Sequence, residues 1–215
     1  MVASMLLVVL TAISGLAAAP TELLGQQPGS AYSAFVEQQV RADRARVVGP
    51  SCAGLTLTAL PRDRVGGNYI PPDIVADSAT GTAMIEHVRA SGCGRISRHN
   101  ILIYRQHSGG WRAIALLPGA SLASPTLQRD TLSTATRAIT QLSTDIPCPP
   151  GSTLPQRLRV GEIVMVTPPA RGGTWVERIP IRYCGVDRSM QVTYTPTADG
   201  GADYALRPLF AMPRQ

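Results

Sequence analysis

The chain contains no lysine and few aromatic residues. Its 20 basic side chains are all arginines, set against 14 acidic ones, and aromatic residues make up 5% of the 215 positions. The arginines are spread evenly, without the dense run that marks a nucleic-acid-binding surface, so we expect no nucleic-acid partner. A mildly basic surface would favour an anionic partner, such as a polymer of a bacterial envelope. The even spread favours the alternative, a solvated surface without such a partner.

Recognisable catalytic motifs are also missing. The sequence has no G-x-S-x-G, H-E-x-x-H or P-loop pattern. Its cysteines form no C-x-x-C pair, and their spacing suits no zinc site. Histidine is scarce, and His99 and His107 are eight residues apart, so they could meet across a hairpin as a metal or acid–base pair. Surface histidines are the favoured alternative, and we predict no catalytic residue, no metal and no cofactor.

The only long apolar run lies at the N-terminus. Residues 1–19 carry no charged side chain, and the run 5–16 is followed by three alanines, Ala17 to Ala19. This pattern predicts a signal peptide at 1–19 and a flexible lead at 20–30. A retained anchor is the alternative, but a dozen apolar residues fall short of the roughly 20 that span a membrane. We therefore expect an exported protein, periplasmic or secreted, with no membrane span in the mature chain.

A spaced pattern occurs twice. Glu86 precedes Cys93 by seven residues, and Glu177 precedes Cys184 by the same distance. Each of these cysteines is followed at once by glycine, and 16 positions after the cysteine by a Gly-Gly pair, at 109–110 and 200–201. The repeat predicts two tandem copies of one module, module one at 31–119 and module two at 124–212, joined by a linker at 120–123.

Each module is predicted to begin with a helix and continue with strands. Tyr32, Val36 and Val40 form an apolar stripe over 31–47, and Ser124-Pro125 is a helix start for module two. Alternating segments follow at 55–60 and 84–93 in module one, and at 162–167 and 175–184 in module two. A hairpin closes each module around its Gly-Gly pair, with arms at 100–104 and 111–117, and at 191–195 and 202–209. The predicted fold is α+β, with one helix and about four antiparallel strands in each copy.

Four cysteines in an exported protein indicate two disulfides. All three possible connectivities are compatible with a twofold repeat. Locality favours Cys52–Cys93 and Cys148–Cys184, because each module then closes itself and its unfolded state loses chain entropy. Free or metal-binding thiols are the alternative.

The repeated pattern of Glu86 or Glu177, a Cys-Gly pair and a Gly-Gly pair, preceded by a helix, resembles that of small exported bacterial proteins. The resemblance covers most of the chain after residue 30. Those proteins carry no assigned activity, so the resemblance implies export and duplication but no reaction.

Two kinds of polar or aromatic residue remain as candidates. Glu86 and Glu177 fall on the apolar faces of their strands, where a carboxylate could act as an acid or base, or could pair with an arginine to hold the strands in register. We favour the arginine pairing. Trp111 and Trp175 could form a carbohydrate platform, but core packing is the commoner role and the one expected here.

These observations predict a non-enzymatic envelope or interaction protein, with a secreted hydrolase of unrecognised site as the alternative. A pocket that gathers Glu86 or Glu177 with His99 would favour the hydrolase. A shallow groove lined by arginine and tyrosine would favour binding.

Overall fold

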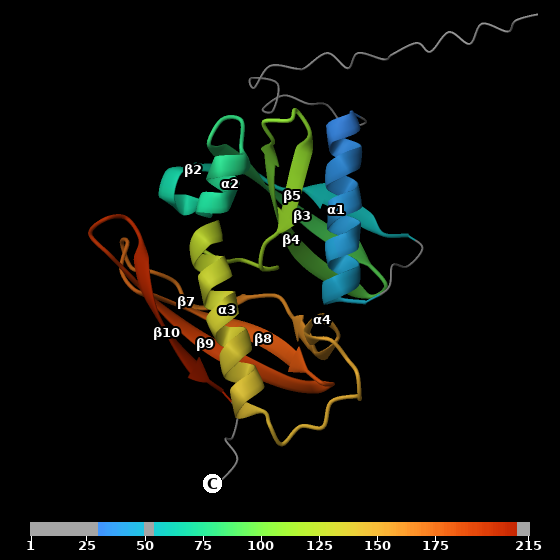
Figure 1. Ribbon diagram of the computed structural model, residues 1–215, viewed down its shortest axis with the longest axis vertical. Coiled ribbons are helices and arrows are strands. Elements are labelled where there is room, and N and C mark those ends of the chain that lie inside the picture. Colours follow the sequence, from blue (N-terminus) through green and yellow to red (C-terminus); the bar gives the residue numbers. More distant parts are fainter. Residues whose placement is uncertain (1–29, 50–53, 210–215) are drawn as a thin grey trace, which may run out of the picture.

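The structure is a computed structural model that describes residues 30–49 and 54–209 (Figure 1). The predicted signal peptide (1–19), almost all of the predicted lead (20–30), Cys52 and residues 210–212 of predicted module two lie outside the described residues. The described part is α+β, with two antiparallel sheets and a few helices. None of the described helices is both long enough and apolar enough to cross a membrane.

Helix α1 (Ala31–Val47) confirms the first predicted helix. It begins after Ser30, whose Oγ accepts a hydrogen bond of 3.2 Å from the backbone N of Ser33 and so caps a free amide. Tyr32 and Val40 are buried against the first sheet. The predicted apolar stripe is therefore the face that packs.

The first sheet has five antiparallel strand segments. They are β1 (Thr56–Ala59), β2 (Asp63–Gly66), β3 (Thr82–Gly92), β4 (Arg95–Arg105) and β5 (Trp111–Ala115). The order is β1-β3-β4-β5, and β1 and β2 lie end to end along the same edge of β3. A 3-10 turn, η2 (Gly67–Tyr69), and helix α2 (Pro72–Asp77) connect β2 to β3.

The second sheet also has five segments, preceded by two helices. These elements are α3 (Pro125–Leu142), α4 (Leu154–Arg157), β6 (Leu158–Val160), β7 (Val164–Thr167), β8 (Trp175–Tyr183), β9 (Val186–Pro196) and β10 (Ala202–Pro208). The order is β10-β9-β8-β6, and β7 pairs with β8 alongside β6. As predicted, α3 begins with Ser124 as its cap, since Ser124 Oγ accepts from Leu127 N. The prediction of about four strands missed β2, whose residues do not alternate between apolar and polar, and β6, which has three residues.

The two sheets bury their faces differently. Strand β8 alternates as predicted, and its inward residues pack against α3, which crosses this sheet in Figure 1. Strand β3 is buried on both faces. One face packs on α1 through Val88. The other face packs through Ile85 on Ile70, which follows η2, and on Ile74, which lies in α2. The first sheet is therefore an inner layer, and His87 and Asn100 on its second face are buried.

The Cys-Gly pairs are hairpin turns. Cys93 and Gly94 have φ of 55° and 69°, and Cys184 and Gly185 have φ of 47° and 85°. Two successive positive φ angles mark the type I′ turn, which fits the twist of a two-residue hairpin. Each Cys-Gly pair thus joins a long strand to the next, β3 to β4 and β8 to β9. The sequence prediction placed hairpins at the Gly-Gly pairs alone.

The Gly-Gly pairs form hairpin turns as predicted. In the first sheet, Gln106 N donates to Gly110 O at 2.9 Å, and Gly109 N donates to Gln106 O at 2.9 Å. In the second sheet, Thr197 N donates to Gly201 O at 3.0 Å, and Gly200 N donates to Thr197 O at 3.1 Å. Gly109 and Gly200 have φ of 91° and 84°, which glycine adopts without strain.

The Cys148–Cys184 disulfide is present, which confirms the second predicted pair. It links the segment after α3 to the turn between β8 and β9 across a sequence separation of 36 residues. The Cys52–Cys93 bridge stays a prediction, because Cys52 lies outside the described residues.

A short seam joins the two sheets. Gly119 forms an isolated parallel bridge with Ile163, and Ile163 N donates to Pro118 O at 2.7 Å. On the other side, Gly119 N donates to Arg98 O of β4 at 2.9 Å. The side chain of Glu162 also accepts a hydrogen bond from the backbone N of Arg98. The predicted linker thus starts inside a hydrogen-bonded junction.

Candidate functional site

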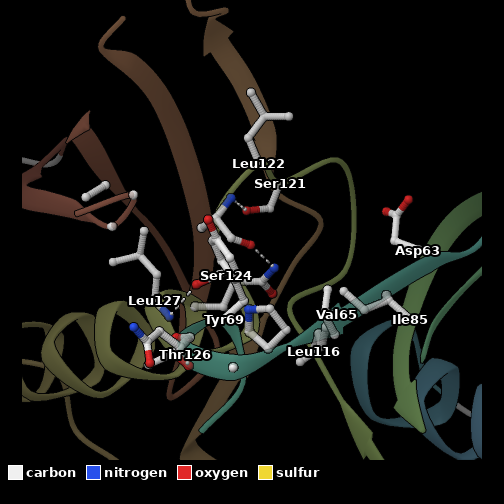
Figure 2. A pocket seen from close by; sticks show the side chains of 18 of the residues that line it. Asp63, Val65, Tyr69, Ile85, Leu116, Ser121, Leu122, Ser124, Thr126 and Leu127 are labelled. Atoms are coloured by element: carbon white, nitrogen blue, oxygen red, sulfur yellow. Dashed lines mark hydrogen bonds between the residues drawn. The ribbon is translucent and has the colours of Figure 1, made fainter. Parts of the chain in front are cut away.

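A pocket of about 740 Å³ lies between the two sheets. Its walls come from β2 and η2, from the linker, from the first turns of α3, and from the turn between β9 and β10. Figure 2 shows β2 along one side of the pocket, with Asp63 at one end, Thr126 and Leu127 at the other, and Tyr69 between them. The pocket therefore brings together segments that are far apart in the chain.

One wall holds a chain of polar side chains on the enclosed face of the first sheet. His87 Nε2 lies 2.9 Å from Asp63 Oδ2, and His87 Nδ1 lies 2.6 Å from Asn100 Oδ1. The amide of Asn100 donates to Leu117 O at 2.7 Å and to Gly119 O at 2.9 Å. These two bonds turn Asn100 Oδ1 toward the imidazole, so His87 Nδ1 donates to it. The wall is thus tied to the segment 117–119, which leads into the linker.

A buried carboxylate holds the opposite wall. Glu177 on β8 accepts hydrogen bonds from Ser121 Oγ at 2.9 Å, from Leu122 N at 2.9 Å and from Trp175 Nε1 at 3.0 Å. The Trp175 ring stacks on Tyr194 with centroids 4.8 Å apart. Ser121, Leu122 and Trp175 all line the pocket, so Glu177 shapes it from behind. Burial raises the pKa of the Glu177 carboxyl, while the three donors lower it by less.

Tyr69 and the Gly200 turn close the pocket between the sheets. The side chain of Tyr69 is half exposed, and its hydroxyl lies 3.2 Å from where a Cβ on Gly200 would be. Any larger residue at 200 would push against this hydroxyl. The second Gly-Gly pair, predicted only as a turn, therefore also forms part of the pocket wall.

The pocket carries more acidic than basic side chains, in a chain whose formal net charge is +6. Asp63, Asp130 and Asp199 line it, together with His87 and with Arg64, whose place on β2 turns its side chain to the other face of the sheet. The Thr197 hydroxyl, followed by the Gly201 amide, lowers the pKa of Asp199, which favours its ionised form. This local charge differs in sign from that of the whole chain.

The two predicted glutamates differ in their partners. Glu86 accepts a hydrogen bond of 2.7 Å from Tyr32 and lies 3.5 Å from Arg62, so the predicted arginine pairing is confirmed there. Burial, followed by the bond to Glu86, raises the pKa of Tyr32. The arginine pairing was wrong for Glu177, whose described partners are Ser121, Leu122 and Trp175. The linker supplies donors that no local sequence pattern could indicate.

The favoured prediction of surface histidines was wrong for His87 and His99, which are 9% and 0% exposed. His99 also does not meet His107 across a hairpin. Strand β4 continues to Arg105, so both histidines lie along one arm, with His107 beyond its end and roughly 26 Å away at about 3.3 Å per residue. His99 Nδ1 instead lies 2.7 Å from Asp43 Oδ2, and its Nε2 lies 2.9 Å from Ser97 Oγ. This order of atoms is that of a catalytic triad.

Burial argues against catalysis by this set. Asp43, Ser97 and His99 are 4%, 3% and 0% exposed, and none of them lines the pocket. A substrate cannot reach Ser97 Oγ through the surrounding side chains. The set instead connects α1 to β4, which fits the structural role of a satisfied buried network.

Both tryptophans pack in or beside a core, as predicted. Trp111 meets the Tyr32 ring edge-on with centroids 5.3 Å apart, and Arg105 lies over its ring at 5.7 Å. Trp175 is 9% exposed, so it presents little of its ring to the pocket. Neither forms an open carbohydrate platform.

Within residues 30–49 and 54–209, no three His, Cys, Asp or Glu side chains come together as a metal site. Comparison of the chain with protein-family models, curated proteins and solved structures finds no match. The site must therefore be interpreted from its own geometry.

The raised pKa of Glu177 predicts a pH-dependent stability. When the pH rises above 4.5, the ordinary pKa of glutamate, Glu177 loses its proton in the unfolded chain before it does in the folded protein. Folding then has to keep the buried carboxyl protonated or bury its charge, and either costs stability. We expect the free energy of unfolding of the wild type to fall relative to that of Glu177→Gln as pH rises from below 4.5 toward neutral. Urea unfolding at a series of pH values measures both curves.

The exposed Glu37→Gln on α1 controls for the loss of one negative charge and should keep the pH dependence of the wild type. Parallel curves for the wild type and Glu177→Gln would contradict the assignment of this titration to Glu177.

Proposed function

We propose that this protein is an exported, non-enzymatic binding protein of two tandem modules that holds its ligand in the pocket between them. The observation that carries the proposal is the pocket itself, whose walls come from both sheets and which presents polar, aromatic and apolar side chains together. The ligand would thus be enclosed by both modules.

The tandem arrangement is supported by the order of the strands. In each sheet two short segments lie along the edge of the first long strand, which then continues through a Cys-Gly turn and a Gly-Gly turn. Export is compatible with the Cys148–Cys184 disulfide, since such bonds persist in oxidising compartments.

Binding explains the pocket better than hydrolysis does. His87, the pocket histidine that could act as a base, is hydrogen-bonded to Asp63 and Asn100 and to no serine of the described chain. Of the pocket serines, Ser121 Oγ donates to Glu177 and Ser124 Oγ caps α3. Both hydroxyls therefore have structural bonds instead of a histidine partner.

A fragment screen tests whether the pocket is the binding site. We expect ligand-observed NMR to find soluble fragments that bind the wild type, and Tyr69→Ala to weaken them about tenfold, which corresponds to ~1.4 kcal/mol. Tyr69 is 52% exposed, so its truncation should leave the fold intact.

Val166→Ala is the matched control, because Val166 is 51% exposed on β7 and does not line the pocket. Equal weakening by both variants would count against the pocket. Turnover of a bound fragment, lost in His87→Gln, would replace the binding proposal with the hydrolase.

A further inference from the structure

We propose that the ligand is an extended polypeptide segment carrying a basic side chain, which adds as a strand to the outer edge of β2. This inference rests on the proposed binding function and names its ligand class. It starts from the position of β2, an edge strand whose four residues all line the pocket.

The backbone alternation shows which groups of β2 face outward. Leu60 N donates to His87 O, so the odd-numbered residues of β3 bond toward its edge neighbours β1 and β2. Asp63 and Val65 of β2 lie opposite the odd-numbered residues Ile85 and Ala83 of β3, so their backbone groups bond to β3. The backbone N–H and C=O groups of Arg64 and Gly66 therefore point away from β3.

Those outward groups have no hydrogen-bond partner within the described part of the chain. Gly66 and Gly67 have no side chains, so they line the pocket with main-chain atoms, and a Cβ on Gly67 would meet open space. A strand edge with unpaired backbone groups and no side chains over them is complementary to an extended peptide backbone.

Charge complementarity selects the side chains of the peptide. Asp63, Asp130 and Asp199 line the pocket, and none of them forms an ion pair with an arginine in the described chain. Arg64 alternates with Asp63 and Val65, so its side chain leaves on the opposite face of the sheet. Tyr69 and Leu122 add apolar contact, with exposed fractions of 52% and 56%. Arginine or lysine on an apolar strand fits these walls.

The probe that tests this inference is a fluorescein-labelled peptide of alternating threonine and valine with a central arginine. Three matched peptides serve as controls. One carries glutamate in place of arginine, and the other two carry N-methyl groups on alternate amides, one peptide for each of the two registers. One of these two lacks the donors that face β2. Fluorescence anisotropy with the full chain measures binding.

We expect the arginine peptide to bind about tenfold more tightly than the glutamate peptide and than the N-methylated peptide that lacks the donors facing β2, whereas the other N-methylated peptide keeps its affinity. Arg64→Pro, which removes an outward N–H at an edge position where proline is tolerated, should abolish binding, and Arg64→Ala should retain it. Circular dichroism and urea unfolding show whether Arg64→Pro is folded, and the N-methylated peptides test the same bond without altering the protein.

Equal binding of both N-methylated peptides and the unmodified peptide would overturn the strand addition. Binding of a neutral envelope oligosaccharide but no peptide, with loss in Tyr69→Ala, would overturn the peptide inference and leave the proposed function standing. If neither peptides nor Tyr69-dependent fragments bind, both proposals fail.

Discussion

Gly119→Ala is expected to destabilise the protein by about 3–4 kcal/mol, because its side chain would overlap the backbone of the second sheet. A Cβ at this position would lie 2.5 Å from Ile163 O and 2.6 Å from Ile163 N. Neither atom can move without breaking the bond from Ile163 N to Pro118 O. Gly119 also has φ of 95°, where alanine is strained. Chemical denaturation monitored by tryptophan fluorescence measures the loss.

Gly109→Ala is the matched control for this change. Gly109 has φ of 91°, but a Cβ there would meet nothing within 4 Å. It should therefore cost only the backbone strain, about 1 kcal/mol. The difference between the two variants isolates the contact between Gly119 and Ile163. Equal losses would mean that the seam between the sheets tolerates a methyl group.

Removal of the Cys148–Cys184 disulfide is expected to cost about 4 kcal/mol. The bridge closes a loop with a sequence separation of 36 residues, so its loss restores chain entropy to the unfolded state. The double variant Cys148→Ser/Cys184→Asn leaves no unpaired thiol at this site, and asparagine suits the positive φ of 47° at position 184. Thermal and urea unfolding of this variant measure the effect of the bridge alone.

A second double variant separates the turn from the bridge. Cys148→Ser/Cys184→Val should lose about 1–2 kcal/mol more than the asparagine version, because a β-branched residue is strained at positive φ. Equal stability of the two variants would argue against the type I′ turn. Non-reducing mass spectrometry of the purified protein gives its disulfide pairing as the accompanying check.

The elements that follow a regular pattern were predicted well from the sequence. The stripe of Tyr32 and Val40 gave the range of α1, and the alternation from Trp175 to Tyr183 gave β8 and its buried face. Both patterns are local, so a single segment contains all the information needed. The short edge segments β2 and β6 were missed, since pairing with β3 and β8 defines them rather than their own composition.

The pocket could not be predicted in the same way. Asp63 and His87 are 24 residues apart, and Ser121 and Glu177 are 56 apart, so only the folded chain brings them together. One signal was available. His87 lies in a strand that is buried on both faces, and a buried polar side chain requires a hydrogen-bond partner. The identity of that partner, Asn100, depends on the register of β3 with β4.

The two connections into the long strands differ in length. Residues 67–81 lead from β2 into β3 and contain η2 and α2, whereas the shorter segment 168–174 leads from β7 into β8. Tyr69 lies in the longer connection together with Ile70 and Ile74, so trimming that loop to the length of its counterpart would remove one side of the cavity and also uncover the apolar face of the first sheet.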